Sequence, residues 1–163
     1  MPYIDSIHSF PKVVKKFIFF FLLALSFGYF TGFRFVYETT HLSPNGIEEN
    51  YNGNESDEEA DIMIFKKSSR EVLTLIHSHV ISFALIFFAV GGILLSVPLN
   101  QKVKTFLLIE PFISTIITFG GIWFITNGVI WFKYIVMISG ILLTFTYLAS
   151  ILLIFYALLQ KPK

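Results

Sequence analysis

Four long, mainly apolar runs alternate with polar segments along the chain, and this pattern predicts four membrane-spanning helices. The runs cover residues 17–36, 80–99, 106–125 and about 129–159. At 1.5 Å per residue, about 20 apolar residues cross the roughly 30 Å hydrocarbon core of a bilayer. With their flanking residues included, we expect a single membrane domain, 1–163, with spans at about 13–37, 72–98, 105–126 and 129–159.

The connections between these runs indicate how the spans are arranged. Residues 100–105 and 126–128 are very short links, which favour antiparallel neighbours. The link at about 38–71 is long and rich in acidic residues. The first run is longer than the apolar core of a signal peptide, so we interpret it as a retained span. The expected fold is an all-α, integral membrane, up-down four-helix bundle with one long acidic outer loop.

Lysine placement predicts the orientation of the bundle. Lysines precede the first span, lie between the second and third, and follow the fourth: Lys12, Lys15, Lys16, Lys102, Lys104, Lys161 and Lys163. Positively charged residues favour the cytoplasmic side. We therefore expect a multi-pass protein of the bacterial inner membrane with both termini in the cytoplasm and the acidic loop outside.

Composition supports a lipid environment and excludes several kinds of site. Hydrophobic residues make up 55% of the 163 residues, charged residues only 14%, and phenylalanine occurs 20 times. There is no cysteine, which excludes disulfides, thiolate metal sites and cysteine nucleophiles. The net charge of +1 and the lack of a basic cluster argue against a nucleic-acid partner.

Two polar clusters stand out at the expected outer ends of the first two spans. Residues three or four positions apart share a helix face, and one such stripe ends in a histidine: Arg34, Tyr37, Glu38 and His41. His77 and His79 begin the second span. These two histidines are about 200° apart on a regular helix, so binding one ion with both requires a broken helix.

Three chemistries suit these clusters. His41, His77 and His79 are candidate ligands for a metal ion or haem, with haem b or copper as the best-suited cofactors. Glu38 is a candidate metal ligand or a partner of a ligand histidine, and Arg34 and Tyr37 are supporting residues. Proton exchange with a quinol is a second hypothesis. Histidines that only snorkel to lipid headgroups, with no cofactor at all, are the third.

A carboxylate inside the third span, Glu110, is the remaining polar feature. We expect it about one turn from the cytoplasmic end of that span, reaching toward Lys102 and Lys104. The alternative is a proton-accepting group within the membrane. Stripes of small residues, such as Ala24, Gly28 and Gly32, predict close approach between helices.

Part of the chain resembles a group of small four-span bacterial inner-membrane proteins with no assigned activity. The resemblance lies in an outer Gly-Asn-Glu loop and a His-x-His at the start of the second span, within the segments Leu42-Ser43-Pro44-Asn45-Gly46-Ile47, Tyr51-Asn52-Gly53-Asn54-Glu55, Lys67-Ser68, Glu71-Val72-Leu73 and His77-Ser78-His79. It implies no activity for any residue, and it implies that the loop is a structured part of the protein.

Two functions therefore compete. The first is a periplasm-facing accessory protein that binds a metal ion or haem and serves a redox enzyme or its maturation. The second is a structural or assembly subunit of a larger membrane complex with no cofactor of its own, and a quinol- or lipid-site protein is a weaker alternative. The sequence has no nucleophile elbow, phosphate loop or metalloprotease motif, which favours a non-enzymatic role. The expected partners are the bilayer and another membrane or periplasmic protein.

Overall fold

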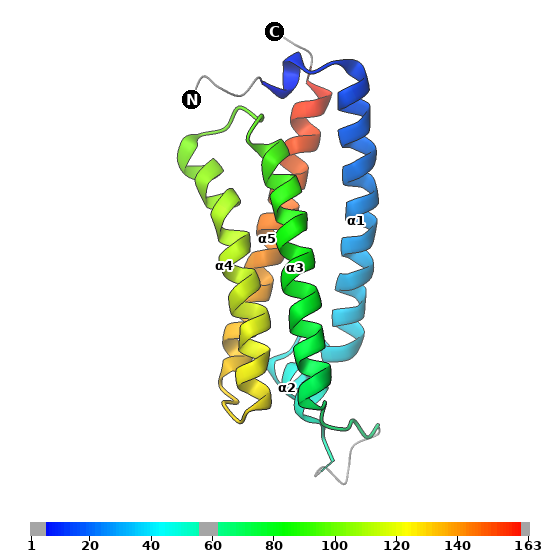
Figure 1. Cartoon of the computed structure of the whole chain (residues 1–163), viewed down its shortest axis with the longest axis vertical. Helices are drawn as coiled ribbons and strands as arrows, with labels where there is room; N and C mark the ends of the chain where they lie inside the picture. The colour runs from blue at the N-terminus through cyan, green and yellow to red at the C-terminus, as the bar shows by residue number, and fades with distance from the viewer. Residues whose placement is uncertain (1–5, 56–61, 161–163) are drawn as a thin grey trace.

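The computed structural model describes residues 6–55 and 62–160, and within these residues it contains helices and no strand. Figure 1 shows the long helices side by side with a short helix beneath them. In chain order the elements are η1 (Ile7–Ser9), α1 (Lys12–Thr40), α2 (Pro44–Asn52), α3 (Ser69–Leu94), α4 (Gln101–Thr126) and α5 (Phe132–Leu159).

The four long helices are each long and apolar enough to cross a membrane: α1, α3, α4 and α5. They run alternately up and down, and the start of the described chain and the end of α5 lie at the same end of the bundle (Figure 1). The predicted all-α membrane bundle of four spanning helices is therefore confirmed. We call the end of the bundle that carries α2 the capped end.

Polar capping residues, rather than hydropathy, decide where α3 and α4 begin. α3 starts at Ser69, earlier than the expected residue 72, because Ser68 and Glu71 form a reciprocal capping box. The Glu71 carboxylate accepts from the Ser68 amide at 2.7 Å. α4 starts at Gln101, earlier than the expected 105, because the Asn100 side chain accepts from the Lys102 amide at 2.9 Å. Hydropathy locates the lipid-crossing part of a helix but not its polar first turn.

The centre of the bundle is an aromatic contact between α1 and α5. The rings of Tyr29 and Tyr147 stack with their centroids 3.8 Å apart, and Tyr147 is fully buried. The Tyr29 hydroxyl donates to Thr144 Oγ1 at 3.1 Å. Such an aromatic pair contributes about 0.5–1.5 kcal/mol beyond its buried area.

Most of the α1 surface faces away from the rest of the chain. Along this helix only Ile18, Leu22 and Thr40 are buried. A Cβ added at Gly28 or Gly32 would meet nothing within 4 Å. Within the described chain no other helix approaches this glycine stripe, so its expected role in close helix contact stays a prediction. Close helix contact occurs instead between α4 and α5, where a Cβ on Gly121 would lie 2.5 Å from a methyl group of Val136.

The segment expected to be one long loop contains a helix, α2. Ser43 caps its N-terminus, and Pro44 occupies the first turn, where its missing N–H costs nothing. Ile47 and Tyr51, four residues apart, lie on one face of α2 and pack against the ends of the spanning helices. A nine-residue helix is marginal alone in water. Packing against the bundle therefore stabilises α2.

Candidate functional site

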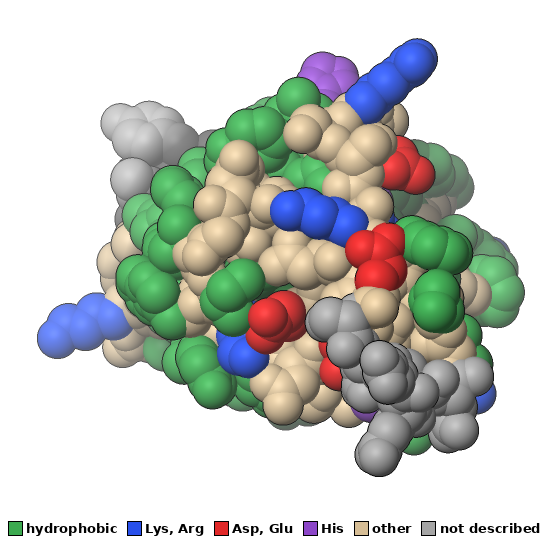
Figure 2. All heavy atoms as spheres, turned by 90° about the horizontal axis from the view of Figure 1, so that it is seen from below, with side chains coloured by type: hydrophobic (Ala, Val, Ile, Leu, Met, Phe, Trp, Pro, Cys, Tyr) green, Lys and Arg blue, Asp and Glu red, His purple; other side chains and the backbone are tan. Residues whose placement is uncertain are grey.

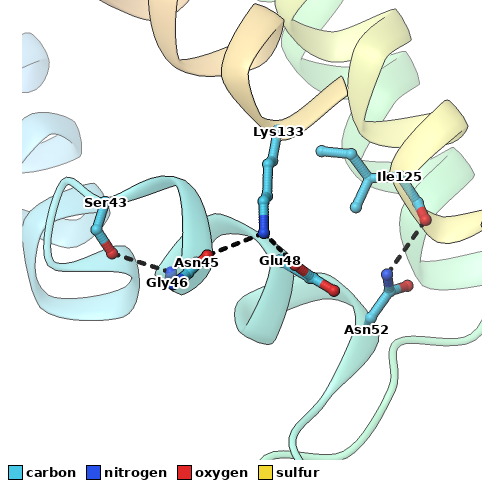
Figure 3. Close-up of polar contacts among 7 residues, drawn as sticks. All are labelled: Ser43, Asn45, Gly46, Glu48, Asn52, Ile125 and Lys133. Atoms are coloured by element: carbon cyan, nitrogen blue, oxygen red, sulfur yellow. Dashed lines mark hydrogen bonds and ion pairs between the residues drawn. The ribbon is translucent and has the colours of Figure 1, made fainter. Parts of the chain in front are cut away.

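A cluster of polar side chains fastens α2 to the capped end of the bundle (Figure 3). Lys133, in the first turn of α5, donates to Glu48 Oε2 at 2.7 Å and to Asn45 Oδ1 at 2.9 Å. The Asn52 side chain donates at 3.2 Å to the carbonyl of Ile125 near the end of α4, which also accepts from the Gly128 amide at 3.1 Å. We call these four side chains, Asn45, Glu48, Asn52 and Lys133, the clamp.

A tight corner turns α1 into α2. Ser43 Oγ accepts from the Gly46 amide at 3.0 Å and donates to the Thr40 carbonyl at 3.2 Å. His41 and Leu42 have φ values of 48° and 50°, in the left-handed region that non-glycine residues rarely occupy. A Cβ on Gly46 would lie 2.0 Å from the Thr40 carbonyl oxygen. Only glycine at this position lets the two helices meet so closely.

After α2 the chain is fastened on both sides of residues 56–61. The Asn54 amide donates to the Ile64 carbonyl at 2.9 Å, and Asn54 Oδ1 accepts from the Ile64 amide at 2.7 Å. The Lys67 amide donates to the Tyr51 carbonyl at 3.1 Å. Burial raises the pKa of the Tyr51 hydroxyl to about 12, so it remains protonated at neutral pH. We call residues 53–55 and 62–67, which these bonds join, the neck. Most of the acidic residues expected in the outer loop lie at positions 57–61, outside the described residues.

The structure gives the three candidate histidines separate surroundings. His41 forms the C-cap of α1 and is exposed. His77 and His79 both belong to α3, which is helical through both positions, so they cannot bind one ion together. The His79 Nδ1 atom lies 2.9 Å from the Leu75 carbonyl oxygen. Because a carbonyl only accepts, Nδ1 is the donor there.

The expected supporting residues pair with one another. Glu38 forms an ion pair with Arg34 one turn earlier on α1, and both side chains are largely exposed. The Arg34 guanidinium also lies over the Tyr37 ring, 5.4 Å from its centroid. Among the described residues there is no group of three or more His, Asp or Glu side chains that could hold a metal ion. The described geometry thus does not assemble the candidate residues into one centre.

The chain matches the model of a family described as a transmembrane helical domain, Aq_1264_TM, over residues 41–163. It belongs to this family. The part of the chain matched to Aq_1264_TM contains the clamp, the neck and α3, α4 and α5, whereas α1 with Arg34, Tyr37 and Glu38 precedes it. No curated protein and no solved structure matches the chain.

Within the Aq_1264_TM domain, Glu110 does not lie where the sequence suggested. The expectation that its carboxylate reaches toward Lys102 and Lys104 is wrong. The side chain is buried, with 7% exposure, and accepts a hydrogen bond from Ser114 one turn later. Lys104 instead donates to the Leu95 carbonyl at 3.0 Å.

Sequence reasoning also missed the clamp. From the sequence, Lys133 was an isolated charge at the start of the fourth span, because its two partners lie more than 80 residues earlier in the chain. The available signals were Ser43-Pro44, which begins a helix, and the apolar pair Ile47 and Tyr51, which predicts where that helix is buried. Figure 2 shows the capped end as a surface of mixed acidic, basic and apolar side chains.

The clamp gives a first testable prediction. Replacing Lys133 by Met leaves Glu48 and Asn45 without their shared donor, and we expect a lower melting temperature of the detergent-purified protein. Glu48→Gln is expected to lower it as well. In the double variant the two losses are expected to be less than additive, because both changes remove the same interaction. Fully additive losses, measured by thermal unfolding, would contradict the described pairing.

Proposed function

We propose that the protein is a structural or assembly subunit, a multi-pass membrane module that binds a larger membrane complex through its capped end. The observation that carries this proposal is the clamp. It joins α2 to the ends of α4 and α5 through an ion pair and two further hydrogen bonds. A helix that only crosses the membrane needs no such cap at its end. A surface fixed in advance binds a partner at a smaller entropic cost than a flexible loop.

The exposed residues of the neck support this role. Ile62, Met63 and Phe65 are apolar and each is at least 60% exposed. In the sequence they lie only a few residues from the charged side chains of the capped end. Apolar side chains rimmed by polar groups are typical of protein-binding surfaces. The distribution of lysines supports a periplasmic capped end in a bacterial inner membrane.

A second candidate function rests on His79. Its Nδ1–H bond to the Leu75 carbonyl leaves Nε2 as the unprotonated nitrogen of the neutral ring. This is the tautomer that ligates metals, and a backbone carbonyl is a common partner for a ligand histidine. The candidate is a periplasm-facing accessory protein that binds haem b or copper and serves a redox enzyme, with His41 as the further ligand.

One experiment on native membranes separates the two candidates. The protein is extracted with its lipids into polymer nanodiscs, and its complex is sized by native gel electrophoresis. Three forms are compared: wild type, the clamp variant Lys133→Met/Asn52→Ala, and the triple variant His41→Ala/His77→Ala/His79→Ala. Absorption spectra and elemental analysis are recorded on the same samples.

For a structural subunit we expect a large complex for wild type and for the triple histidine variant. The clamp variant is expected to remain in the membrane but to run at the size of the free protein. A free protein of unchanged size in all three samples would contradict the proposed role. A Soret band or stoichiometric copper that disappears only in the histidine variant would instead establish the second candidate.

A further inference from the structure

A groove of about 530 Å³ lies between α4 and α5, on a surface that the rest of the described chain leaves uncovered. Its walls are apolar and belong to both helices; Phe106, Ile109, Ile113, Ile138 and Leu142 are among them. These five side chains are each at least 36% exposed. In a bilayer they face lipid, so the groove opens sideways into the membrane rather than to water.

Four polar side chains line this groove: Thr105, Glu110, Ser114 and Ser139. Ser114 donates to one carboxyl oxygen of Glu110, and Ser139 bonds Thr118 at 2.7 Å. The second carboxyl oxygen, Oε2, is buried and has no hydrogen-bond partner among the described residues. A buried polar atom without a partner destabilises the structure, so a ligand that bonds it gains that interaction.

We propose that this groove binds a membrane-soluble molecule with a neutral hydroxyl headgroup and a long apolar chain. A hydroxyl can donate to this carboxyl oxygen, whereas an ether of the same shape cannot. The apolar walls would hold the chain, and Glu110 would hold the headgroup. The volume is within the range of about 300–1,000 Å³ that small-molecule sites occupy.

The depth of Glu110 selects against a charged headgroup. Glu110 lies six residues after Lys104, the last charged residue before it, which places it about 9 Å further along the axis of α4. A phosphate at this depth would lose its hydration in the hydrocarbon region. Two sources have the required chemistry: an isoprenoid quinol and a diacylglycerol. The proposal is independent of the clamp and of the histidines.

The test uses the full-length protein in nanodiscs and a long-chain alcohol that carries a diazirine for photocrosslinking. The control probe is the same molecule with the hydroxyl replaced by a methyl ether. We expect saturable labelling of α4 and α5 along the groove, with the alcohol binding about tenfold more tightly than the ether, as one hydrogen bond predicts. Competition by a short-chain quinol or by dioleoylglycerol then identifies the source.

Two variants make the test specific. Glu110→Leu is expected to remove the preference for the alcohol. Ile138→Trp is expected to block the groove to both probes. Ile141→Trp, on the same helix at an exposed site outside the groove, is the matched control and should change neither.

If Glu110→Leu fails to fold, the comparison of Ile138→Trp with Ile141→Trp still decides the matter. Equal labelling by alcohol and ether, or labelling that neither Glu110→Leu nor Ile138→Trp alters, would overturn the proposal.

Discussion

Replacing Gly46 by Ala is expected to separate α2 from the end of α1. Of all substitutions that add one methyl group at the capped end, we expect this one to lower the stability most. The new Cβ would lie 2.0 Å from the Thr40 carbonyl oxygen and 2.6 Å from its carbon, both backbone atoms that a side-chain rotation cannot move. Ser43 and Thr40 hold this corner together, so relief of the overlap breaks their hydrogen bonds. We expect a loss of about 3 kcal/mol in the free energy of unfolding.

The matched control is Gly28→Ala in α1. It adds the same methyl group to a helix, but at a site with no atom within 4 Å. Because Ala forms helices better than Gly, stability is expected to be unchanged or slightly higher. Thermal unfolding in detergent and protease sensitivity of residues 41–55 measure both variants. Equal behaviour of the two would mean that α1 and α2 do not meet at this corner.

Replacing Gly53 by Ala is expected to open the neck. Gly53 has a φ of 79° and a ψ of 173°, a conformation that glycine alone adopts without strain. A Cβ there would also lie 2.6 Å from the Ile64 carbonyl oxygen and 2.7 Å from the Lys66 nitrogen. These atoms belong to the backbone next to the Asn54–Ile64 pairing, which we expect to be lost.

Hydrogen exchange measures this effect directly, at the amides of Asn54, Ile64 and Lys67. A loss of about 2 kcal/mol in local opening free energy raises their exchange about 30-fold. Gly128→Ala is the control that separates backbone strain from steric overlap of the added methyl group. Gly128 has a φ of 92°, but no atom lies within 4 Å of an added Cβ. It is expected to cost about 1–2 kcal/mol, from backbone strain alone. Exchange at the three neck amides that Gly53→Ala leaves unchanged would contradict the described pairing.

The candidate site was only partly accessible from sequence. Helical spacing predicted that Arg34 and Glu38 share a face, and in the structure they form an ion pair. It also predicted that one helix cannot direct His77 and His79 to the same ion. It could not tell that Glu38 would be occupied by Arg34 rather than supporting a histidine, or that His79 would bond its own helix at Leu75. Whether the histidines bind any cofactor stays a prediction that the absorption spectrum tests.

The sequence by itself determined the number and apolar character of the spanning helices. Each span satisfies its backbone hydrogen bonds within itself, so local hydrophobicity over about 20 residues is sufficient. Tertiary structure alone decided the rest. The Lys133–Glu48 pair joins residues 85 positions apart, and α2 is stable only against the ends of α4 and α5. Burial of Glu110 depends on how α4 packs within the bundle. No local pattern encodes this, because a helix of given hydropathy can direct the same residue either toward lipid or toward a neighbouring helix.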